Sequence, residues 1–195
     1  MTSNVDDFML EEYRQIAQAF FALHTQRNQL LRYYLTLMTI GVSIVSVCSQ
    51  AIPTVLSQAQ TVLNNQLLGM MILFLFVMGM IIFIAIIGVR HDMLFYARTI
   101  NSIRRYFQDK NPSVKSYLIL PTSNQVPSFW EKPLKYFFWE VSSIAVANSF
   151  IAVMSSSLLI ALEGLWLLIV FVLCLFFHEL IYGILSALRE REFRK

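Results

Sequence analysis

The longest stretch without a charged side chain most limits what this chain can fold into. None of the 57 residues from position 33 to position 89 is Asp, Glu, Lys or Arg. A helix needs about 20 apolar residues to cross a bilayer, so this stretch has room for two spans and a connection. We assign the spans to residues 35–53 and 67–89, with a polar, uncharged loop at 57–66.

A second apolar block, residues 136–188, is too long for one span and is interrupted at 161–164 by Ala-Leu-Glu-Gly. We interpret it as two more spans joined by a tight hairpin. Apolar residues make up 57% of the chain and charged residues only 14%, a composition that is not typical of a soluble domain. The predicted fold is an all-α, polytopic membrane protein with four transmembrane helices, surrounded by the lipid bilayer.

The basic residues indicate how these spans are oriented. All 15 Lys and Arg lie before the first span, between the second and third, or after the fourth. Because basic residues concentrate on the cytoplasmic side, both termini and residues 90–135 are expected in the cytoplasm. The connection near Gln60 and the hairpin at Glu163 are expected on the opposite face.

The first two spans are expected to extend as helices beyond the membrane. No Pro or paired Gly interrupts residues 6–52, and the helix after Val89 should continue to about residue 110, where Asn111-Pro112 ends it. The segment 35–110 thus contains the first two transmembrane helices and the cytoplasmic extension of the second. We predict that a cytoplasmic helix, residues 1–34, packs antiparallel against this extension. A helix lying on the membrane surface is the alternative. Apolar stripes on the two helices give the candidate partner-facing residues Ile16, Phe20, Ile100 and Ile103.

Two further segments are expected in the cytoplasm. Residues 111–135 contain four of the five prolines and are assigned to a loop, and residues 189–195 to a basic tail. Aromatic residues around Trp130 and Trp139 are typical of a membrane interface. A ligand-binding loop is the other interpretation of this segment.

The first span carries a row of polar side chains that step by three and four residues along one helix face. Several copies of the chain could line a water-filled path with this face, and close helix packing is the alternative. The pore-lining candidates are Arg32, Thr36, Thr39, Ser43, Ser46 and Gln50.

A second polar group is expected inside the membrane, around the last hairpin. If the turn centres near Glu163, then Asn148 and His178 lie at the same depth, with Glu179 next in sequence. Ionisable groups at this depth are candidates for a functional site, such as a proton-linked gate. The alternative is a neutral His178 that is hydrogen-bonded to Asn148.

Signatures of enzymes are absent from the sequence, which contains no zinc-protease, Walker, dinucleotide-binding or nucleophile-elbow motif. The three histidines, His24, His91 and His178, are too far apart in sequence to indicate a metal cluster. We therefore expect no catalytic activity, no metal and no cofactor. Nucleic acid is not an expected partner, because the membrane topology already accounts for the basic residues.

Residues 1–110 resemble the SLATT-type proteins, small bacterial membrane effectors of antiphage defence. The resemblance rests on a charged helix (residues 11–32), two spans with a short external connection, and a basic helix containing Phe95-Tyr-Ala-Arg-Thr-Ile-Asn-Ser-Ile-Arg-Arg-Tyr-Phe107. It implies a bacterial inner membrane location and a homo-oligomer that permeabilises the membrane upon a nucleotide or partner signal. The chain differs from that pattern by two added spans, and no nucleotide-sensing domain is recognisable.

Three functions remain open from the sequence. The first is an oligomeric pore that the cytoplasmic helices gate after a signal from a cytoplasmic protein or a nucleotide-signalling partner. The second is a membrane-anchored scaffold that recruits a cytoplasmic partner without conducting ions. The third is a small proton-linked transporter that uses Glu179.

Overall fold

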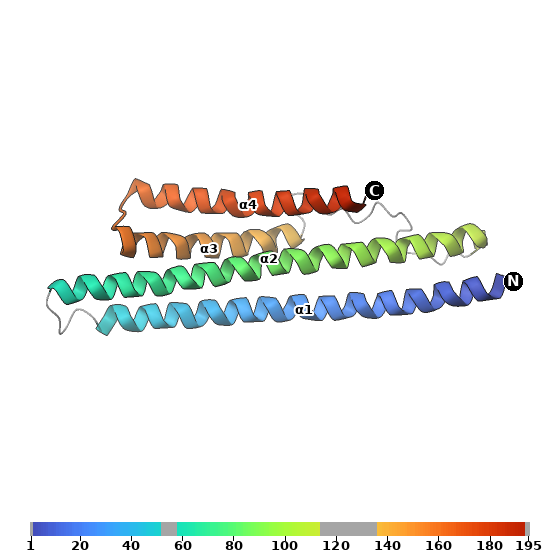
Figure 1. Cartoon of the computed structure of the whole chain (residues 1–195), viewed down its shortest axis with the longest axis horizontal. Coiled ribbons are helices and arrows are strands. Elements are labelled where there is room, and N and C mark those ends of the chain that lie inside the picture. Colours follow the sequence, from blue (N-terminus) through green and yellow to red (C-terminus); the bar gives the residue numbers. More distant parts are fainter. Residues whose placement is uncertain (1, 52–57, 114–135, 194–195) are drawn as a thin grey trace. The chain divides into compact units, whose positions relative to one another are not determined.

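The computed structural model describes residues 2–51, 58–113 and 136–193, and this part of the chain is all-helical (Figure 1). The four helices are α1 (Thr2–Ala51), α2 (Gln58–Lys110), α3 (Tyr136–Ile160) and α4 (Leu165–Phe193). Three helical segments in the described residues are long and apolar enough to cross a membrane: Asn65–Lys110, Phe137–Ile160 and Leu165–Glu192. This finding indicates association with a membrane. The span predicted in α1 is not among the three and stays a prediction.

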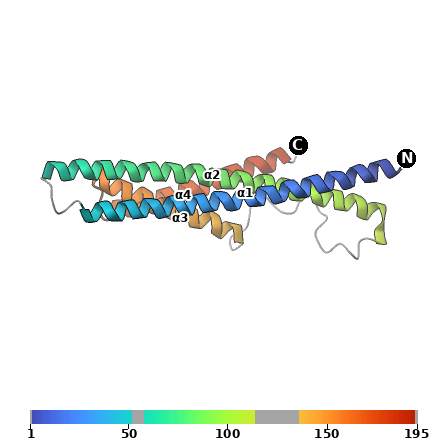
Figure 2. The same ribbon diagram turned by 90° about the horizontal axis from the view of Figure 1, so that it is seen from below.

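Helices α1 and α2 are unusually long, with 50 and 53 residues (Figure 2). The prediction of one helix through residues 6–52 is confirmed up to Ala51, and Ile52 lies outside the described residues. Helix α2 ends at Lys110, as the Asn111-Pro112 pair predicts, and the amide of Asn111 still donates to the carbonyl of Phe107 at 3.0 Å. Of the predicted loop 111–135, residues 114–135 lie outside the described residues.

One predicted loop is helical instead. The loop expected at 57–66 is wrong from Gln58 onward, because α2 begins there. The basic tail expected at 189–195 is helical up to Phe193, where α4 ends. In both segments the polar residues show where the apolar sequence ends, but they do not exclude a helix. Gln, Ala, Leu, Arg and Glu are good helix formers, and neither segment contains Gly or Pro.

The predicted hairpin between the last two helices is confirmed. Helix α3 ends at Ile160 and α4 begins at Leu165, so the turn consists of residues 161–164. Ala161 and Gly164 have positive φ angles of 51° and 56°. Gly164 takes this conformation without steric cost, whereas Ala161 is held there by the turn.

The chain forms two compact units, which we call unit 1 and unit 2. Unit 2 comprises Leu30–Ile86 and Glu131–Leu185, and its described part contains segments of all four helices. Its surface is rich in large apolar side chains, including Phe74, Leu173 and Phe176, whereas Asn148 and His178 are fully buried. Apolar residues outside and polar residues inside are what a hydrocarbon solvent favours.

Unit 1 comprises Met1–Gln29, Ile87–Trp130 and Ser186–Lys195. Within it, the first part of α1 contacts the last part of α2. Lys110 pairs with Asp6, which also accepts a 3.2 Å hydrogen bond from the hydroxyl of Tyr106. Arg104 donates to the hydroxyl of Tyr13 at 3.3 Å. These contacts join the two helix segments of unit 1.

A buried ion pair joins α2 to α4 in unit 1. The guanidinium of Arg98, whose side chain is only 2% exposed, donates to a carboxylate oxygen of Glu190 at 2.9 Å. Nearby, the ring of His91 is 3.2 Å from the hydroxyl of Ser186. The end of α4 is therefore part of the core of unit 1.

Candidate functional site

The polar row on α1 lies on the surface of unit 2. Arg32, Thr36, Thr39, Ser43 and Ser46 are all exposed, and Gln50 lies outside the residues whose side chains the structure describes. Two of the hydroxyls donate to their own helix, Thr39 to the carbonyl of Leu35 and Ser43 to the carbonyl of Thr39, both at 2.8 Å. This back-bonding satisfies the hydroxyl hydrogens and leaves lone pairs on the oxygens as acceptors.

The predicted polar group around the hairpin forms a connected network in unit 2. The amide nitrogen of Asn148 is 3.2 Å from Nε2 of His178, and Nδ1 of His178 is 2.7 Å from the carbonyl oxygen of Cys174. Because a carbonyl only accepts, Nδ1 carries the proton and Nε2 accepts from the amide. The geometry therefore matches a neutral His178, with its tautomer set by Cys174.

Tyr34 and Gly79 complete this network, and the sequence analysis identified neither. The hydroxyl of Tyr34 is 3.1 Å from Oδ1 of Asn148 and 3.3 Å from the carbonyl oxygen of Ile144. A Cβ added at Gly79 would overlap Oδ1 of Asn148, so only glycine allows α2 to approach this closely. The Asn148 side chain is thus the point in unit 2 where α1, α2 and α4 meet α3.

Glu179 does not take part in the Asn148 network. Its carboxylate accepts a 3.0 Å hydrogen bond from the hydroxyl of Ser142, while the ring of His178 packs edge-on against Phe83, with ring centroids 4.9 Å apart. Consecutive helix residues point about 100° apart, which separates the two side chains. The two residues therefore belong to different sites.

The candidate partner-facing residues lie in unit 1. Ile16 and Ile103 are buried, at 7% and 4% exposed, so what they contact is this chain itself. Phe20 and Ile100 are half-buried and line a hollow of about 300 Å³ between α1 and α2. A partner that binds this surface would therefore meet Phe20 and Ile100 before Ile16 or Ile103.

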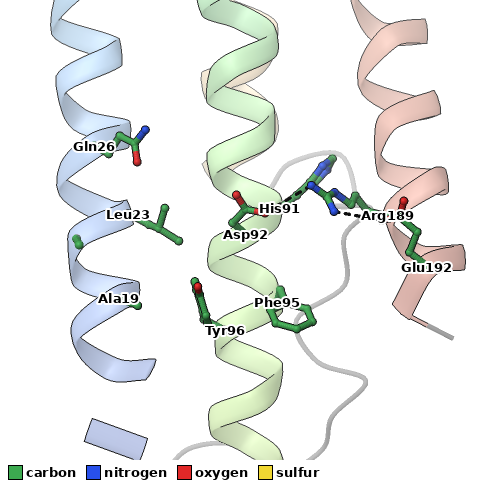
Figure 3. A pocket seen from close by; sticks show the side chains of 10 residues that line it. Ala19, Leu23, Gln26, His91, Asp92, Phe95, Tyr96, Arg189 and Glu192 are labelled. Carbon is green, nitrogen blue, oxygen red and sulfur yellow. Dashed lines mark hydrogen bonds and ion pairs between the residues drawn. The ribbon is translucent and has the colours of Figure 1, made fainter. Parts of the chain in front are cut away.

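A larger cavity of about 640 Å³ lies in unit 1 between α1, α2 and α4 (Figure 3). Ala19, Ala22, Leu23 and Gln26 contribute to its α1 side. Its other lining residues come from α2 and α4: His91, Asp92, Phe95, Tyr96, Arg189 and Glu192. This cavity is not predicted by the sequence, because its walls come from three segments far apart in the chain.

Charges of both signs line this cavity. Figure 3 shows Arg189 between two carboxylates, at 3.6 Å from Asp92 and 3.1 Å from Glu192. His91 lies beside them, and burial lowers its pKa to about 4, with further lowering by the positive charges of Arg189 and Arg90. His91 is therefore a neutral ring at physiological pH, and Asp92, Arg189 and Glu192 carry the charge of the cavity.

In the described residues, no three His, Cys, Asp or Glu side chains come close enough to hold a metal ion. Comparison with known proteins finds no match: no family model, no curated protein and no solved structure is similar to this chain. The resemblance to SLATT-type proteins therefore stays a prediction.

Proposed function

We propose that the chain is the membrane subunit of an oligomeric pore, an effector of the SLATT type in the bacterial inner membrane. In this proposal both termini and the charged parts of α1 and α2 lie in the cytoplasm, as the basic residues favour. The observation that carries the proposal is the exposure of Thr36, Thr39 and Ser43 on α1. They form a polar row on the surface of a unit that buries Asn148 and His178 completely.

An exposed polar row is unfavourable against lipid and favourable against water or another polar surface. The row is about four helical turns long from Arg32 to Ser46, about 20 Å at 1.5 Å per residue, and so covers much of a bilayer's depth. Copies of the chain that turn this row toward a common axis would surround a path lined by hydroxyl oxygens. Arg32 would then lie at its cytoplasmic end.

In this proposal the helices of unit 1 form the gate of the pore. Its helices α1, α2 and α4 are held together by polar contacts that a bound partner can compete for, among them Asp6–Lys110 and Arg98–Glu190. Because α1 and α2 are each one helix from unit 1 into unit 2, a change of their contacts in unit 1 can act on the polar row. In this mechanism the signal comes from a cytoplasmic partner.

The test is depolarisation of bacterial cells upon induced expression, read with a membrane-potential dye. The parent chain should depolarise the cells, and Thr39→Leu combined with Ser43→Leu should abolish the effect while cross-linking still shows assembly. The matched control is Ser143→Leu on α3, because that exposed hydroxyl also donates to a carbonyl four residues earlier, at 2.7 Å. A parent that leaves the potential unchanged, or a double variant as active as the parent, contradicts the pore.

A membrane-anchored scaffold is the second candidate, and the hollow at Phe20 and Ile100 favours it. Phe21, at 69% exposed, also lines this hollow, which leaves apolar surface for a partner helix. A scaffold predicts that Phe20→Asp or Ile100→Asp removes a co-purifying soluble protein, while Gln18→Asp at an exposed position of α1 does not. It also predicts no depolarisation by the parent chain.

A further inference from the structure

We propose that the 640 Å³ cavity of unit 1 binds the headgroup of a phospholipid that carries a primary ammonium, the phosphatidylethanolamine class. This inference rests on the association of the chain with a membrane and is independent of any pore. Four features support it: the depth of the cavity along two helices, its charges of both signs, its apolar wall and its size.

The depth follows from the position of the cavity along α2 and α4. On α2 the lining residues His91 to Tyr96 begin two residues after Val89, the end of the charge-free stretch. On α4 Arg189 directly follows the apolar block. At 1.5 Å per residue, these side chains start within about 2 to 10 Å of the apolar boundary. The headgroup layer is about 5 to 8 Å thick on each side of a bilayer, so the α2 and α4 walls begin at the depth where phospholipid headgroups are most concentrated. The α1 wall, Ala19 to Gln26, lies at least seven residues before the charge-free stretch, so the cavity extends from this layer toward the water.

The charges match a zwitterion better than an anion. With His91 neutral, the cavity has one cation, Arg189, and two carboxylates, Asp92 and Glu192. Arg189 can donate to a phosphate while the two carboxylates accept from an ammonium, so every charge keeps a partner of opposite sign. A headgroup with a phosphate and no cation would meet two carboxylates at close range, which is unfavourable.

The carboxylates also distinguish a primary ammonium from a choline group. A primary ammonium has three N–H donors for Asp92 and Glu192, whereas a quaternary ammonium has none. Both carboxylates are more than half exposed, at 51% and 67%, and can turn toward a ligand. Hydrogen bonds from the ammonium to Asp92 and Glu192 therefore favour an ethanolamine headgroup over a choline headgroup.

The remaining wall is apolar and suits the glycerol and upper acyl part of a lipid. Ala19, Ala22 and Leu23 present small and aliphatic side chains on α1, and Phe95 and Tyr96 present rings on α2. A volume of 640 Å³ lies in the usual range for small-molecule sites, about 300 to 1,000 Å³. An amphiphile with a compact zwitterionic head fits this combination of polar and apolar surface.

The experiment is native mass spectrometry of the full chain in detergent, with equal amounts of phosphatidylethanolamine, phosphatidylcholine and phosphatidylglycerol of identical acyl chains. We expect preferential retention of phosphatidylethanolamine, and about tenfold weaker retention by Arg189→Gln or Asp92→Asn, the loss typical of one charge-assisted hydrogen bond. The matched control is Arg191→Gln, an exposed arginine of α4 that does not line the cavity. Circular dichroism and gel filtration identify variants that fold.

Three results would overturn the proposal. Equal retention of the three lipids removes the ammonium selectivity, and equal loss in Arg189→Gln and Arg191→Gln shows a non-specific charge effect. Competition by soluble phosphoethanolamine at the same concentration as the lipid would show that the bilayer is not the source of the ligand. The assay reads lipid retention and no membrane potential, so its outcome is separate from that of the pore experiment.

Discussion

Units 1 and 2 differ in the polar groups that join their helices: unit 1 has the ion pairs Arg98–Glu190 and Asp6–Lys110, whereas unit 2 has the buried hydrogen-bonded pair Asn148 and His178. In unit 2, Asn148 and His178 are fully buried, whereas Leu173 and Phe176 are 61% and 65% exposed. In unit 1, Asp6 pairs with Lys110 at the surface. Unit 2 thus exposes large apolar side chains and buries two polar ones within a core that also contains Phe83 and Ile144. The surface ion pair in unit 1 is typical of a protein in water.

The helices of the two units are held together by different interactions. In hydrocarbon, the apolar side chains of unit 2 gain no hydrophobic free energy by packing against another helix. Close packing and the polar network around Asn148 therefore have to determine how its helices associate. In unit 1 the ion pair Arg98–Glu190 joins α2 to α4, and of its two side chains only that of Arg98 is fully buried. Mutations should therefore act through buried charge in unit 1 and through hydrogen bonds and steric fit in unit 2.

The largest effect is expected for Arg98→Met in unit 1. It removes the charge-assisted hydrogen bond of 2.9 Å between a guanidinium that is 2% exposed and the carboxylate of Glu190, at a cost of about 3 kcal/mol in the free energy of unfolding. The measurement is denaturant unfolding of the full chain in mixed micelles, followed by circular dichroism.

The matched control for this variant is Arg105→Met. Arg105 pairs with Asp109 at 3.7 Å, and both side chains are more than 60% exposed, so its loss should cost less than about 1 kcal/mol. If both variants lose the same stability, burial is not what makes the Arg98 pair important, and the distinction between the units weakens.

The next effect is expected for Asn148→Ala in unit 2. The variant removes the partner of Nε2 of His178 and one acceptor of the Tyr34 hydroxyl, and an unsatisfied buried group costs about 2 kcal/mol. The same unfolding experiment measures it. Ser143→Ala removes an exposed hydroxyl from the same helix and should change stability very little, so equal losses would argue against a structural role for the network.

The contact between Asn148 and His178 could be predicted from the sequence because it depends on counting alone. Both residues lie 15 positions from Glu163, and a tight turn there puts them at the same depth. The long uninterrupted helices could also be predicted, because the sequence lacks Pro across them. The boundary at Gln58 could not, because polar sequence and helix-forming sequence overlap there.

Tyr34 and Gly79 could not be predicted as members of the Asn148 network. They lie on α1 and α2, and their depth relative to Asn148 depends on how far each helix is shifted along its neighbours, which periodicity does not determine. Arg98 was missed for a different reason. Membrane topology already accounts for its charge, so nothing in the sequence indicates the buried pair with Glu190.

A smaller effect is expected for Gly79→Ala, compared with Gly88→Ala on the same helix. Both substitutions gain helix propensity, up to about 1 kcal/mol. A Cβ at position 79 overlaps Oδ1 of Asn148, whereas a Cβ at position 88 meets nothing within 4 Å. We expect Gly79→Ala to be less stable than Gly88→Ala by about 1 to 3 kcal/mol, the usual cost of overpacking. Equal stabilities would mean that α2 and α3 do not approach closely at Asn148.

The smallest effect is a pH dependence that comes from His91 in unit 1. Burial, together with Arg189 and Arg90, lowers the pKa of His91 to about 4 from its ordinary 6.5, so between these values the unfolded chain binds more protons than the folded one. The stability from a neutral His91 is present above pH 6.5 and is lost as the pH falls toward 4. The expected decrease is about 1 kcal/mol between pH 6 and pH 5.

His91→Gln should remove this slope, because glutamine does not titrate but can still reach the Ser186 hydroxyl that lies 3.2 Å from the His91 ring. His24→Gln is the matched control, since His24 is an exposed histidine on α1 of the same unit. Stability measured at both pH values for the parent and the two variants decides the question. A slope that persists in His91→Gln would assign the titration to another group, and the buried His91 ring would then not be the source of the pH dependence.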